Sequence, residues 1–296
     1  MKKYLVIGNP IDHSLSPRLH NKWFKTAEIE AVYDKKQIEE KDLKEIINKV
    51  KNETIDGINV TVPFKKSVIP FLDELTPEAN KVQSVNTILK KNNKIIGANT
   101  DIYGFEASLA YYGNFKLKNK KIFILGAGGV VSSIIYVLKK MGVAKITVSN
   151  RTKKKVEDLR KIYPDLEVID WGQNIEFDMI INATSLGLDE QDKIGLDFSE
   201  LEYIDPKETY KSENNKKRKF NSTKLFYDVI YMHGDKETNF LLSGKKLGHE
   251  TMDGSLMFLH QAAESFRIWH ETQPNIDWDG KAQMKDLEDL KLNYLL

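Results

Sequence analysis

The sequence contains no cysteine. Disulfide bonds, thiolate nucleophiles and cysteine-ligated metal sites are therefore excluded. The six histidines form no pair at the spacing of metal ligands, so we expect no bound metal.

Long apolar runs and a strong charge of one sign are also absent. No stretch approaches the roughly 18 apolar residues of a membrane span. The apolar run at residues 4–7 is shorter than the ~7–15 residues of a signal-peptide core. The formal net charge is only +2, which gives no case for nucleic acid or a membrane surface as a partner. We therefore expect a cytoplasmic protein.

What the sequence does contain is an alternation of short β-branched runs and helical patterns. Residues 3–8 (KYLVIG) predict a buried strand, and the helix that follows should have Ser16 as its N-cap and Pro17 at its first position. Residues 84–101 predict a hairpin whose apolar runs are joined by residues 91–93. Residues 205–223 are polar and charged, and we interpret them as an exposed loop without function.

The pattern restarts after a boundary near residues 102–113. A strand, a glycine turn and a helix are followed by four more strand-like runs and another helix. Strands that alternate with helices predict a parallel, doubly wound sheet with helices on both faces, and hence an α/β fold. The final helical pattern, residues 254–270, places its apolar residues on one face at helical spacing.

The glycine turn has the context of a dinucleotide fingerprint. Gly126 and Gly128 stand directly between a β-branched strand and a helix. Gly126 would allow the tight turn, and Gly128 would let the backbone approach a pyrophosphate at the helix N-terminus. Val131 occupies the third small position, which departs from the pattern. The alternative is a glycine turn that binds nothing.

The end of the next strand favours NADP over NAD. An NAD site places an acid here for the ribose hydroxyls, whereas an NADP site places cations for the 2′-phosphate. This sequence offers Asn150, Arg151, Thr152 and Lys155, and no acid before Glu157. The guanidinium of Arg151 can bind a phosphate through two donors. The alternative is a solvated first turn of a helix.

Eight motifs occur here in one order: GNPIDHSLSPRLHN, INVTVPFK, SVNTI, GANTD, LGAGG, NRT, INATSLG and DGSLMFLHQAAESF. With them the chain resembles the shikimate dehydrogenase family, from about Tyr4 to Phe266. The resemblance implies reversible, NADPH-dependent reduction of 3-dehydroshikimate to shikimate in aromatic amino-acid biosynthesis. It implies two domains: a substrate domain of residues 1–103 completed by helices in 254–296, and a Rossmann-type NADP domain of residues 104–253. Monomer and homodimer both stay open.

The resemblance also assigns roles to residues. Lys65 and Asp101 would be catalytic, because a nearby ammonium can stabilise charge on the substrate oxygen and supply its proton. From the residues alone, Lys65 would be a surface lysine and Asp101 a helix N-cap. The residues expected to bind substrate are Ser14, Ser16, Asn59, Thr61, Asn86, Tyr231 and Gln261. Those expected to bind cofactor are Gly126, Ala127, Gly128, Gly129, Asn150, Arg151, Thr152, Lys155, Thr184, Ser185, Gly254 and Met257.

Some of these positions have plain structural alternatives. Ser16 taken alone would be a helix cap, whereas Ser14 has no capping role in the predicted helix. Met257 fits a core methionine equally well. His233 stands where the family usually has proline, and Ser255 and Leu256 stand where it usually has a second glycine.

Two other functions remain to be weighed. The first is a quinate/shikimate dehydrogenase paralogue that uses NAD. The second is a non-catalytic sensor that binds a dinucleotide or a ring acid. The missing acid near Arg151 argues against the first, and the presence of both Lys65 and Asp101 argues against the second.

Overall fold

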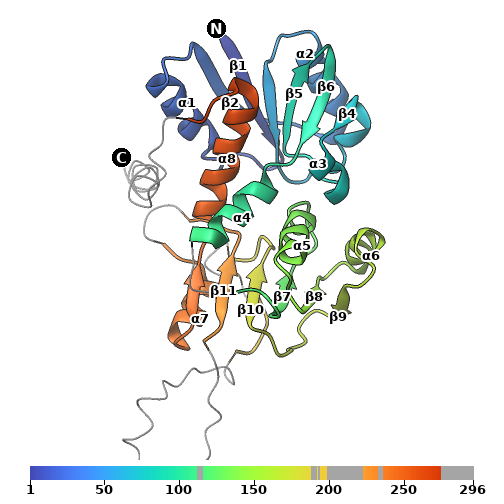
Figure 1. The fold of residues 1–296 in the computed structure, drawn as a ribbon, viewed down its shortest axis with the longest axis vertical. Coiled ribbons are helices and arrows are strands. Elements are labelled where there is room, and N and C mark those ends of the chain that lie inside the picture. The colour runs from blue at the N-terminus through green and yellow to red at the C-terminus, as the bar shows by residue number, and fades with distance from the viewer. Residues whose placement is uncertain (112–115, 188–191, 193, 199–222, 233–235, 275–296) are drawn as a thin grey trace, which may run out of the picture. The chain divides into compact units, whose positions relative to one another are not determined.

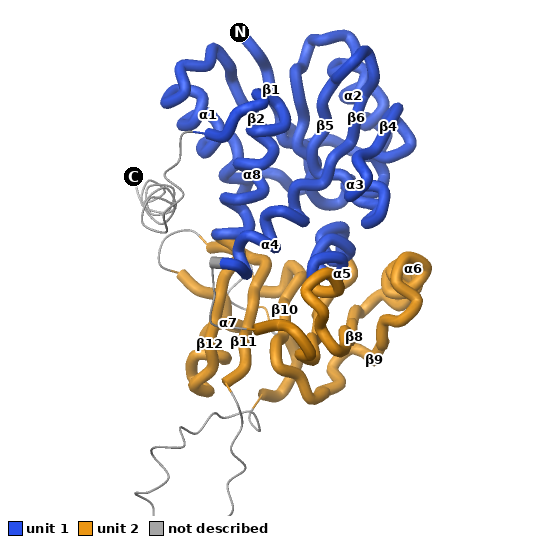
Figure 2. Tube along the Cα trace, in the orientation of Figure 1, with its two compact units in different colours: residues 1–113, 128–137, 256–296 blue, residues 114–127, 138–255 orange. Residues whose placement is uncertain are grey.

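The computed structural model of the chain describes residues 1–111, 116–187, 192, 194–198, 223–232 and 236–274 (Figure 1). The chain divides into two compact units (Figure 2). Unit 1 comprises Met1–Gly113, Gly128–Val137 and Leu256–Leu296, and unit 2 comprises Asn114–Ala127 and Leu138–Ser255. The sequence-based boundary was 103/104. Most of the predicted loop 205–223, His233 and the C-terminal residues 275–296 lie outside the described residues.

Unit 1 contains a mixed sheet of six strands in the order β2-β1-β3-β5-β6-β4. Its strands are β1 (Lys2–Gly8), β2 (Ala31–Gln37), β3 (Gly57–Val60), β4 (Glu74–Leu75), β5 (Thr87–Lys91) and β6 (Lys94–Ala98). Its helices are α1 (Ser16–Thr26), α2 (Leu43–Lys51), α3 (Pro77–Val82), α4 (Asp101–Tyr111), the first part of α5 (Val131–Lys140) and nearly all of α8 (Ser255–His270), with 3-10 turns at Glu40–Asp42 and Ile69–Phe71. Strands β1, β2 and β3 are parallel, whereas β5 runs antiparallel to β3 and β6.

Two local predictions in unit 1 need correction. Lys91 pairs with Lys94 across the hairpin, so the turn has two residues, Asn92 and Asn93, and not three. Both have positive φ (52° and 61°), as a tight hairpin turn of the kind favoured by asparagine requires. Helix α1 begins at Ser16 after the N-cap Leu15, so Ser16 is not the cap.

The core of unit 1 follows from the amphipathic pattern of its helices. Helix α2 buries Leu43, Ile46, Ile47 and Val50, which lie on one face at helical spacing. They pack in a single apolar cluster with strand residues such as Ile58. Each such side chain contributes about 1.5–3 kcal/mol when it is removed from water. This packing holds the strand that precedes Lys65.

Unit 2 contains six parallel strands in the order β12-β11-β10-β7-β8-β9. They are β7 (Lys121–Leu125), β8 (Lys145–Ser149), β9 (Glu167–Ile169), β10 (Met179–Asn182), β11 (Leu225–Asp228) and β12 (Glu250–Met252), joined by the end of α5, by α6 (Lys153–Ile162) and by α7 (Asn239–Lys246). Successive strands advance in one direction from β7 to β9 and in the other from β10 to β12. The α/β, doubly wound prediction is therefore confirmed, and β7 and β10 flank the point where the strand order reverses.

A buried carboxylate holds the end of this sheet together. Asp228 is fully buried at the end of β11. It accepts hydrogen bonds from Thr238 Oγ1 (2.6 Å), Asn182 Nδ2 (3.0 Å) and the Ile230 N–H (3.0 Å). Burial raises the pKa of Asp228 to about 7, although these hydrogen bonds oppose the shift. The side chain thus joins β10 and β11 to Thr238, which caps α7.

Substituting Asp228→Asn should remove a pH dependence of stability. The pKa of Asp228 is about 7 in the folded chain against an ordinary value of 3.8, so the folded chain holds this proton more tightly than the unfolded chain. The resulting stabilisation of the fold is complete below pH 3.8 and is lost as pH rises through 7. We expect the wild-type unfolding free energy to fall by up to roughly 4 kcal/mol over that range from this group, and the variant to lack this component. Urea denaturation at a series of pH values measures it. Asp170→Asn, which changes an exposed carboxylate, is the control. The assignment would be contradicted if the unfolding free energy of Asp228→Asn depended on pH as steeply as that of wild type.

Candidate functional site

A buried ion pair lies at the centre of the predicted site residues. Lys65 follows β3, Asp101 is the first residue of α4, and Lys65 Nζ lies 2.6 Å from Asp101 Oδ2. Lys65 is 9% exposed and Asp101 is 4% exposed. Removing two charges from water costs several kcal/mol per ion unless further hydrogen bonds compensate. Lys65 is therefore not the surface lysine that its local sequence indicates.

The second oxygen of Asp101 is also bound. Asp101 Oδ1 accepts from Asn86 Nδ2 at 3.0 Å. The N-terminal capping contact of α4 comes instead from Asn99, whose Oδ1 accepts from the Ile102 N–H at 3.1 Å. The N-cap alternative for Asp101 is thus wrong, and its carboxylate is directed to Lys65 and Asn86.

Three predicted amide side chains gather around this pair. Asn86 Nδ2 also lies 3.4 Å from Gln261 Oε1, which is half-buried on α8. Asn59 Nδ2 donates to the main-chain oxygen of Asn86 at 2.9 Å. The structure therefore brings Lys65, Asn59, Asn86, Asp101 and Gln261 together from β3, α4, α8 and the loops that follow β3 and precede β5.

The serine loop and Thr61 follow parallel strands of the same sheet. The loop carrying Ser14 and Ser16 follows β1, and Thr61 follows β3. A side chain at Gly8 would meet Thr61 Cγ2 at 2.5 Å, so the chain after β1 passes directly beside the chain after β3. Ser14 does have a local structural role, because its Oγ accepts from the Ser16 N–H at 3.3 Å at the start of α1.

The glycine turn lies at the reversal of strand order in unit 2. Gly126 has φ +111°, and a side chain there would meet the Ala183 main-chain oxygen, which follows β10, at 2.7 Å. A side chain at Gly128 would meet nothing within 4 Å. Packing therefore explains Gly126, whereas Gly128 leaves open space beside the start of α5. Open space at a helix N-terminus after a parallel strand fits a dinucleotide phosphate.

Within unit 1, the start of α5 packs against Lys65. A side chain at Gly129 would meet Lys65 Cβ at 3.0 Å. Ser84 Oγ donates to the Gly129 oxygen at 2.9 Å, and Ser132 Oγ donates to the Val82 oxygen at 2.6 Å. Neither serine is predicted from the sequence. Both lie inside or beside the motifs, but each bonds to a residue remote in the chain.

The remaining predicted cofactor residues lie at the ends of strands or at the start of α8. Arg151, Thr152 and Lys155 are exposed between β8 and the first turn of α6, and Asn150 Nδ2 donates to the Thr152 oxygen at 2.9 Å. The positive charge of neighbouring Lys153 is offset by Asp170 Oδ1 at 3.2 Å.

The other predicted site residues, in the loops after β10 and β11 and at the start of α8, make local packing and hydrogen-bond contacts. Thr184 Oγ1 donates to Asn182 Oδ1 at 2.7 Å, and Ser185 is exposed. A side chain at Gly254 would overlap the main chain of Val229. The Met257 side chain is buried at 4% exposure. Tyr231 is half-buried after β11.

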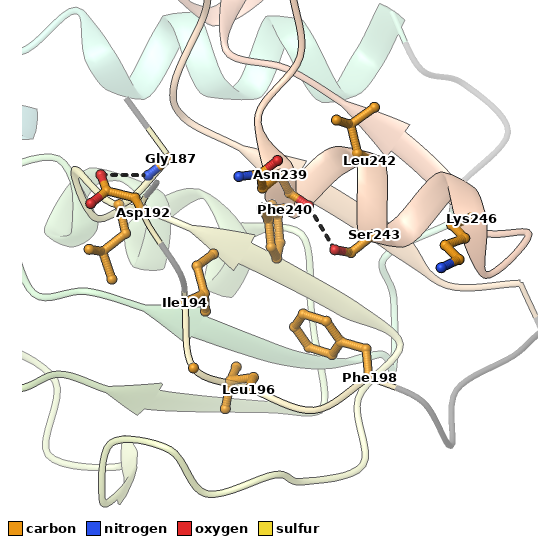
Figure 3. A pocket seen from close by; sticks show the side chains of 12 residues that line it. Gly187, Asp192, Ile194, Leu196, Phe198, Asn239, Phe240, Leu242, Ser243 and Lys246 are labelled. Atoms are coloured by element: carbon orange, nitrogen blue, oxygen red, sulfur yellow. Dashed lines mark hydrogen bonds between the residues drawn. The ribbon is translucent and has the colours of Figure 1, made fainter. Parts of the chain in front are cut away.

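A pocket of about 450 Å³ lies elsewhere in unit 2, between α7 and the chain after β10 (Figure 3). It is lined by Leu186, Gly187, Asp192, Ile194, Gly195, Leu196, Phe198, Asn239, Phe240, Leu242, Ser243 and Lys246. None of these is a predicted site residue. Within the described residues, no group of three or more His, Asp or Glu side chains could hold a metal ion, and no helix is long and apolar enough to cross a membrane.

Comparisons with known proteins find matches in both units. The model of the shikimate dehydrogenase substrate binding domain matches residues 6–88, and that of shikimate / quinate 5-dehydrogenase matches residues 109–186. A curated shikimate dehydrogenase (NADP(+)) of Pelagibacter ubique is 50% identical over 93% of this chain and 96% of its own length. Another, of Staphylococcus haemolyticus, is 37% identical over 93% of this chain and 94% of its own length.

Two solved structures extend the comparison to the fold. Shikimate dehydrogenase of Aquifex aeolicus has a TM-score of 0.80 and 34% identity, covering 98% of both chains. Shikimate 5-dehydrogenase of Thermus thermophilus, in complex with NADP(H) and shikimate, has a TM-score of 0.78 and 27% identity over 98% of this chain and 100% of that chain. Together with the family models and the curated relatives, these structures lead to one conclusion: the chain belongs to the shikimate dehydrogenase family.

Proposed function

We propose that this chain catalyses the reversible reduction of 3-dehydroshikimate to shikimate with NADPH, as an oxidoreductase acting on a CH–OH group. The curated relatives carry the name shikimate dehydrogenase (NADP(+)), and one of them is 50% identical over nearly the whole chain. The single observation that carries the proposal is the buried Lys65–Asp101 pair, at 2.6 Å, with Asn86 and Gln261 beside it.

The pair suits the chemistry of a carbonyl group. NADPH supplies the hydride when it is bound. Charge then develops on the substrate oxygen, where the Lys65 ammonium stabilises it and delivers a proton from Nζ. Asp101 accepts one of the three ammonium N–H groups, so it orients Nζ and keeps a positive charge in a buried place. In the reverse direction the Lys65 amine, after it has released its proton, receives the hydroxyl proton.

Polar groups around the pair would hold the ring acid. In this proposal Asn59, Asn86 and Gln261 position or bind the ring hydroxyls, with Thr61 and Tyr231 as further donors. Ser14 and Ser16 would donate to the substrate carboxylate from the loop before α1, where helix N–H groups also favour an anion. The Ser14 Oγ can donate to substrate while it accepts from the Ser16 N–H.

The NADP assignment depends on two segments. Gly126, Ala127, Gly128 and Gly129 would hold the pyrophosphate at the start of α5, and Asn150, Arg151, Thr152 and Lys155 would bind the 2′-phosphate after β8. Thr184, Ser185, Gly254 and Met257 are the other proposed contacts. Exposure of Arg151 and Lys155 supports this role, because both cations can reach a phosphate. We also propose a cytoplasmic location and a monomer or homodimer.

Oxidation of shikimate tests the function directly. We expect the purified chain to form NADPH from NADP⁺ and shikimate, measured by absorbance of the reduced cofactor. NAD⁺ in place of NADP⁺ should support much slower turnover, because the segment after β8 offers cations and no acid. Absence of NADPH formation with shikimate would rule out the proposal, and preference for NAD⁺ would favour the paralogue.

Lys65→Ala should lower kcat by at least about 100-fold, because it removes the proposed general acid. The change leaves Asp101 buried without its cation and should also destabilise the fold by about 3–5 kcal/mol. Kinetics are therefore measured well below the melting temperature, on protein with a folded circular-dichroism spectrum. Lys90→Ala is the control, since Lys90 also forms an ion pair in unit 1, with Glu53 at 2.8 Å. Near-normal turnover of Lys65→Ala would exclude the role given to Lys65.

Arg151→Ala should raise the KM for NADPH by roughly tenfold or more, the expected loss for a charge-assisted hydrogen bond to phosphate. The KM for NADH should change little, because NADH has no 2′-phosphate. Lys153→Ala is the matched control, since Asp170 already pairs with that lysine. An equal rise in the KM for NADPH and in the KM for NADH would show that Arg151 does not bind the 2′-phosphate.

A further inference from the structure

A hydrogen-bond network inside unit 1 continues beyond the residues that the family resemblance assigns. Its members are Tyr33 on β2, Asn59 on β3, Asn86 just before β5, Thr87 on β5, Thr100 just before α4, and Ser265 on α8. All of them are 7% exposed or less. A buried polar network is stabilising only when its members are satisfied, and it then specifies one arrangement.

The orientation of the Asn59 amide is fixed by its neighbours. The main-chain oxygen of Asn86 can only accept, so the atom 2.9 Å from it must be Asn59 Nδ2. Asn59 Oδ1 therefore points to Tyr33 Oη, 2.6 Å away, and this hydroxyl must be the donor. Removing the Tyr33 hydroxyl would leave a buried amide oxygen without this donor, and rotating the amide would place two oxygens against each other.

The orientation of the Asn86 amide is fixed in the same way. The Thr100 N–H can only donate, and it lies 2.7 Å from Asn86 Oδ1. Asn86 Nδ2 therefore points to Asp101 Oδ1 at 3.0 Å, and the other oxygen of Asp101 binds Lys65. A continuous path of donors and acceptors thus leads from Tyr33 to the ammonium of Lys65.

Ser265 on α8 binds the Asn59 amide directly and is linked to the Asn86 amide through Thr87 and Thr100. Three groups approach its Oγ: Asn59 Nδ2 at 3.0 Å, Thr87 Oγ1 at 2.8 Å and Thr100 Oγ1 at 3.1 Å. Its own hydroxyl hydrogen can reach the Gln261 main-chain oxygen at 3.0 Å. The Ser265 hydroxyl therefore connects β3, β5, the start of α4 and the helix turn that carries Gln261.

Tyr33 itself is held firmly. Its ring stacks on His20 at 4.4 Å with an interplanar angle of 2°. Burial among aromatic rings lowers the pKa of His20 to about 3, so the stacked ring is neutral. The Asn21 side chain bonds the Tyr33 main chain at both N–H (2.9 Å) and C=O (2.8 Å), as a neighbouring strand would. Helix α1 therefore aims the tyrosine hydroxyl at Asn59.

We propose that the hydroxyls of Tyr33 and Ser265 are positioning groups for the reaction. They fix the amides of Asn59 and Asn86, and through Asn86 they hold the Asp101 carboxylate at Lys65. This inference rests on the proposed function, because its effect is read in shikimate turnover. Neither hydroxyl is a proton donor to the substrate.

The experiment compares Tyr33→Phe with Tyr4→Phe. Tyr4 is the partner of Tyr33 in the register of β1 and β2, and both rings contact Trp269, so each variant removes one hydroxyl from the same aromatic cluster. We expect Tyr33→Phe to lower kcat for shikimate oxidation roughly tenfold, with the KM for NADP⁺ unchanged. Tyr4→Phe should keep the wild-type kcat. Urea denaturation of both variants separates turnover from stability.

Substitutions of Ser265 give an independent comparison, which also decides the matter if Tyr33→Phe fails to fold. Ser265→Ala should lower kcat by a similar factor. Ser265→Thr keeps the hydroxyl but adds a methyl group to a fully buried position, so it should be less stable than Ser265→Ala and yet more active. If activity followed stability alone, Ser265→Ala would be more active than Ser265→Thr.

Three results would overturn the inference: wild-type kcat in both Tyr33→Phe and Ser265→Ala, equal losses in the two tyrosine variants, or a threonine variant less active than the alanine variant. With an active wild type, these results leave the proposed function standing. A wild type without activity toward shikimate would overturn the proposed function and the inference with it.

Discussion

The burial of one ammonium and one carboxylate sets the requirements for much of unit 1. The 2.6 Å contact between Lys65 and Asp101 offsets the free-energy cost of removing both charges from water only if the remaining oxygen and N–H groups also form hydrogen bonds. This explains why amides and hydroxyls accumulate between β3, β5, α4 and α8, where apolar packing alone would be more stable. The second oxygen of Asp101 is bound by Asn86, and Asn86 is itself bound by Thr100. Asn86 and Thr100 therefore supply the partners that the buried carboxylate requires.

The glycine turn shows how one short segment meets two packing requirements. Gly126 lies against the chain after β10, where a side chain would collide with Ala183. Gly129 lies against the aliphatic part of Lys65 and is held by Ser84. Gly128, between them, has no such packing reason, and its open surroundings leave the start of α5 accessible to a phosphate. Packing thus accounts for Gly126 and Gly129, whereas no neighbouring atom requires a glycine at position 128.

The sequence predicted what depends on local pattern. The parallel sheet, the glycine turn and the hairpin of β5 and β6 all follow from alternation, β-branching and turn residues within short windows. Strand β2 escaped prediction, because its second half, residues 34–37, is charged or polar and exposed at the edge of the sheet. From local sequence alone Asp101 would be the cap of α4, because aspartate is a good cap, but Asn99 makes the capping contact.

The site could be predicted only through the family resemblance. Lys65 and Asp101 are 36 residues apart, and nothing near either residue indicates that both are buried. Asn59 and Ser265 are 206 residues apart, so no local pattern relates them. Burial and pairing are properties of the folded chain, which is why the local sequence of Lys65, followed by Lys66, predicts a surface residue.

The claim that Lys65 and Asp101 act as one unit is tested most directly by a double-mutant cycle on kcat. Lys65→Met, Asp101→Asn and the double variant are compared with wild type in shikimate oxidation. If the two groups act as a unit, the double variant should be no slower than the slower single variant, because the second substitution removes a group that is already without its partner. Losses that multiply would contradict the account, since they would mean that the ammonium and the carboxylate contribute independently.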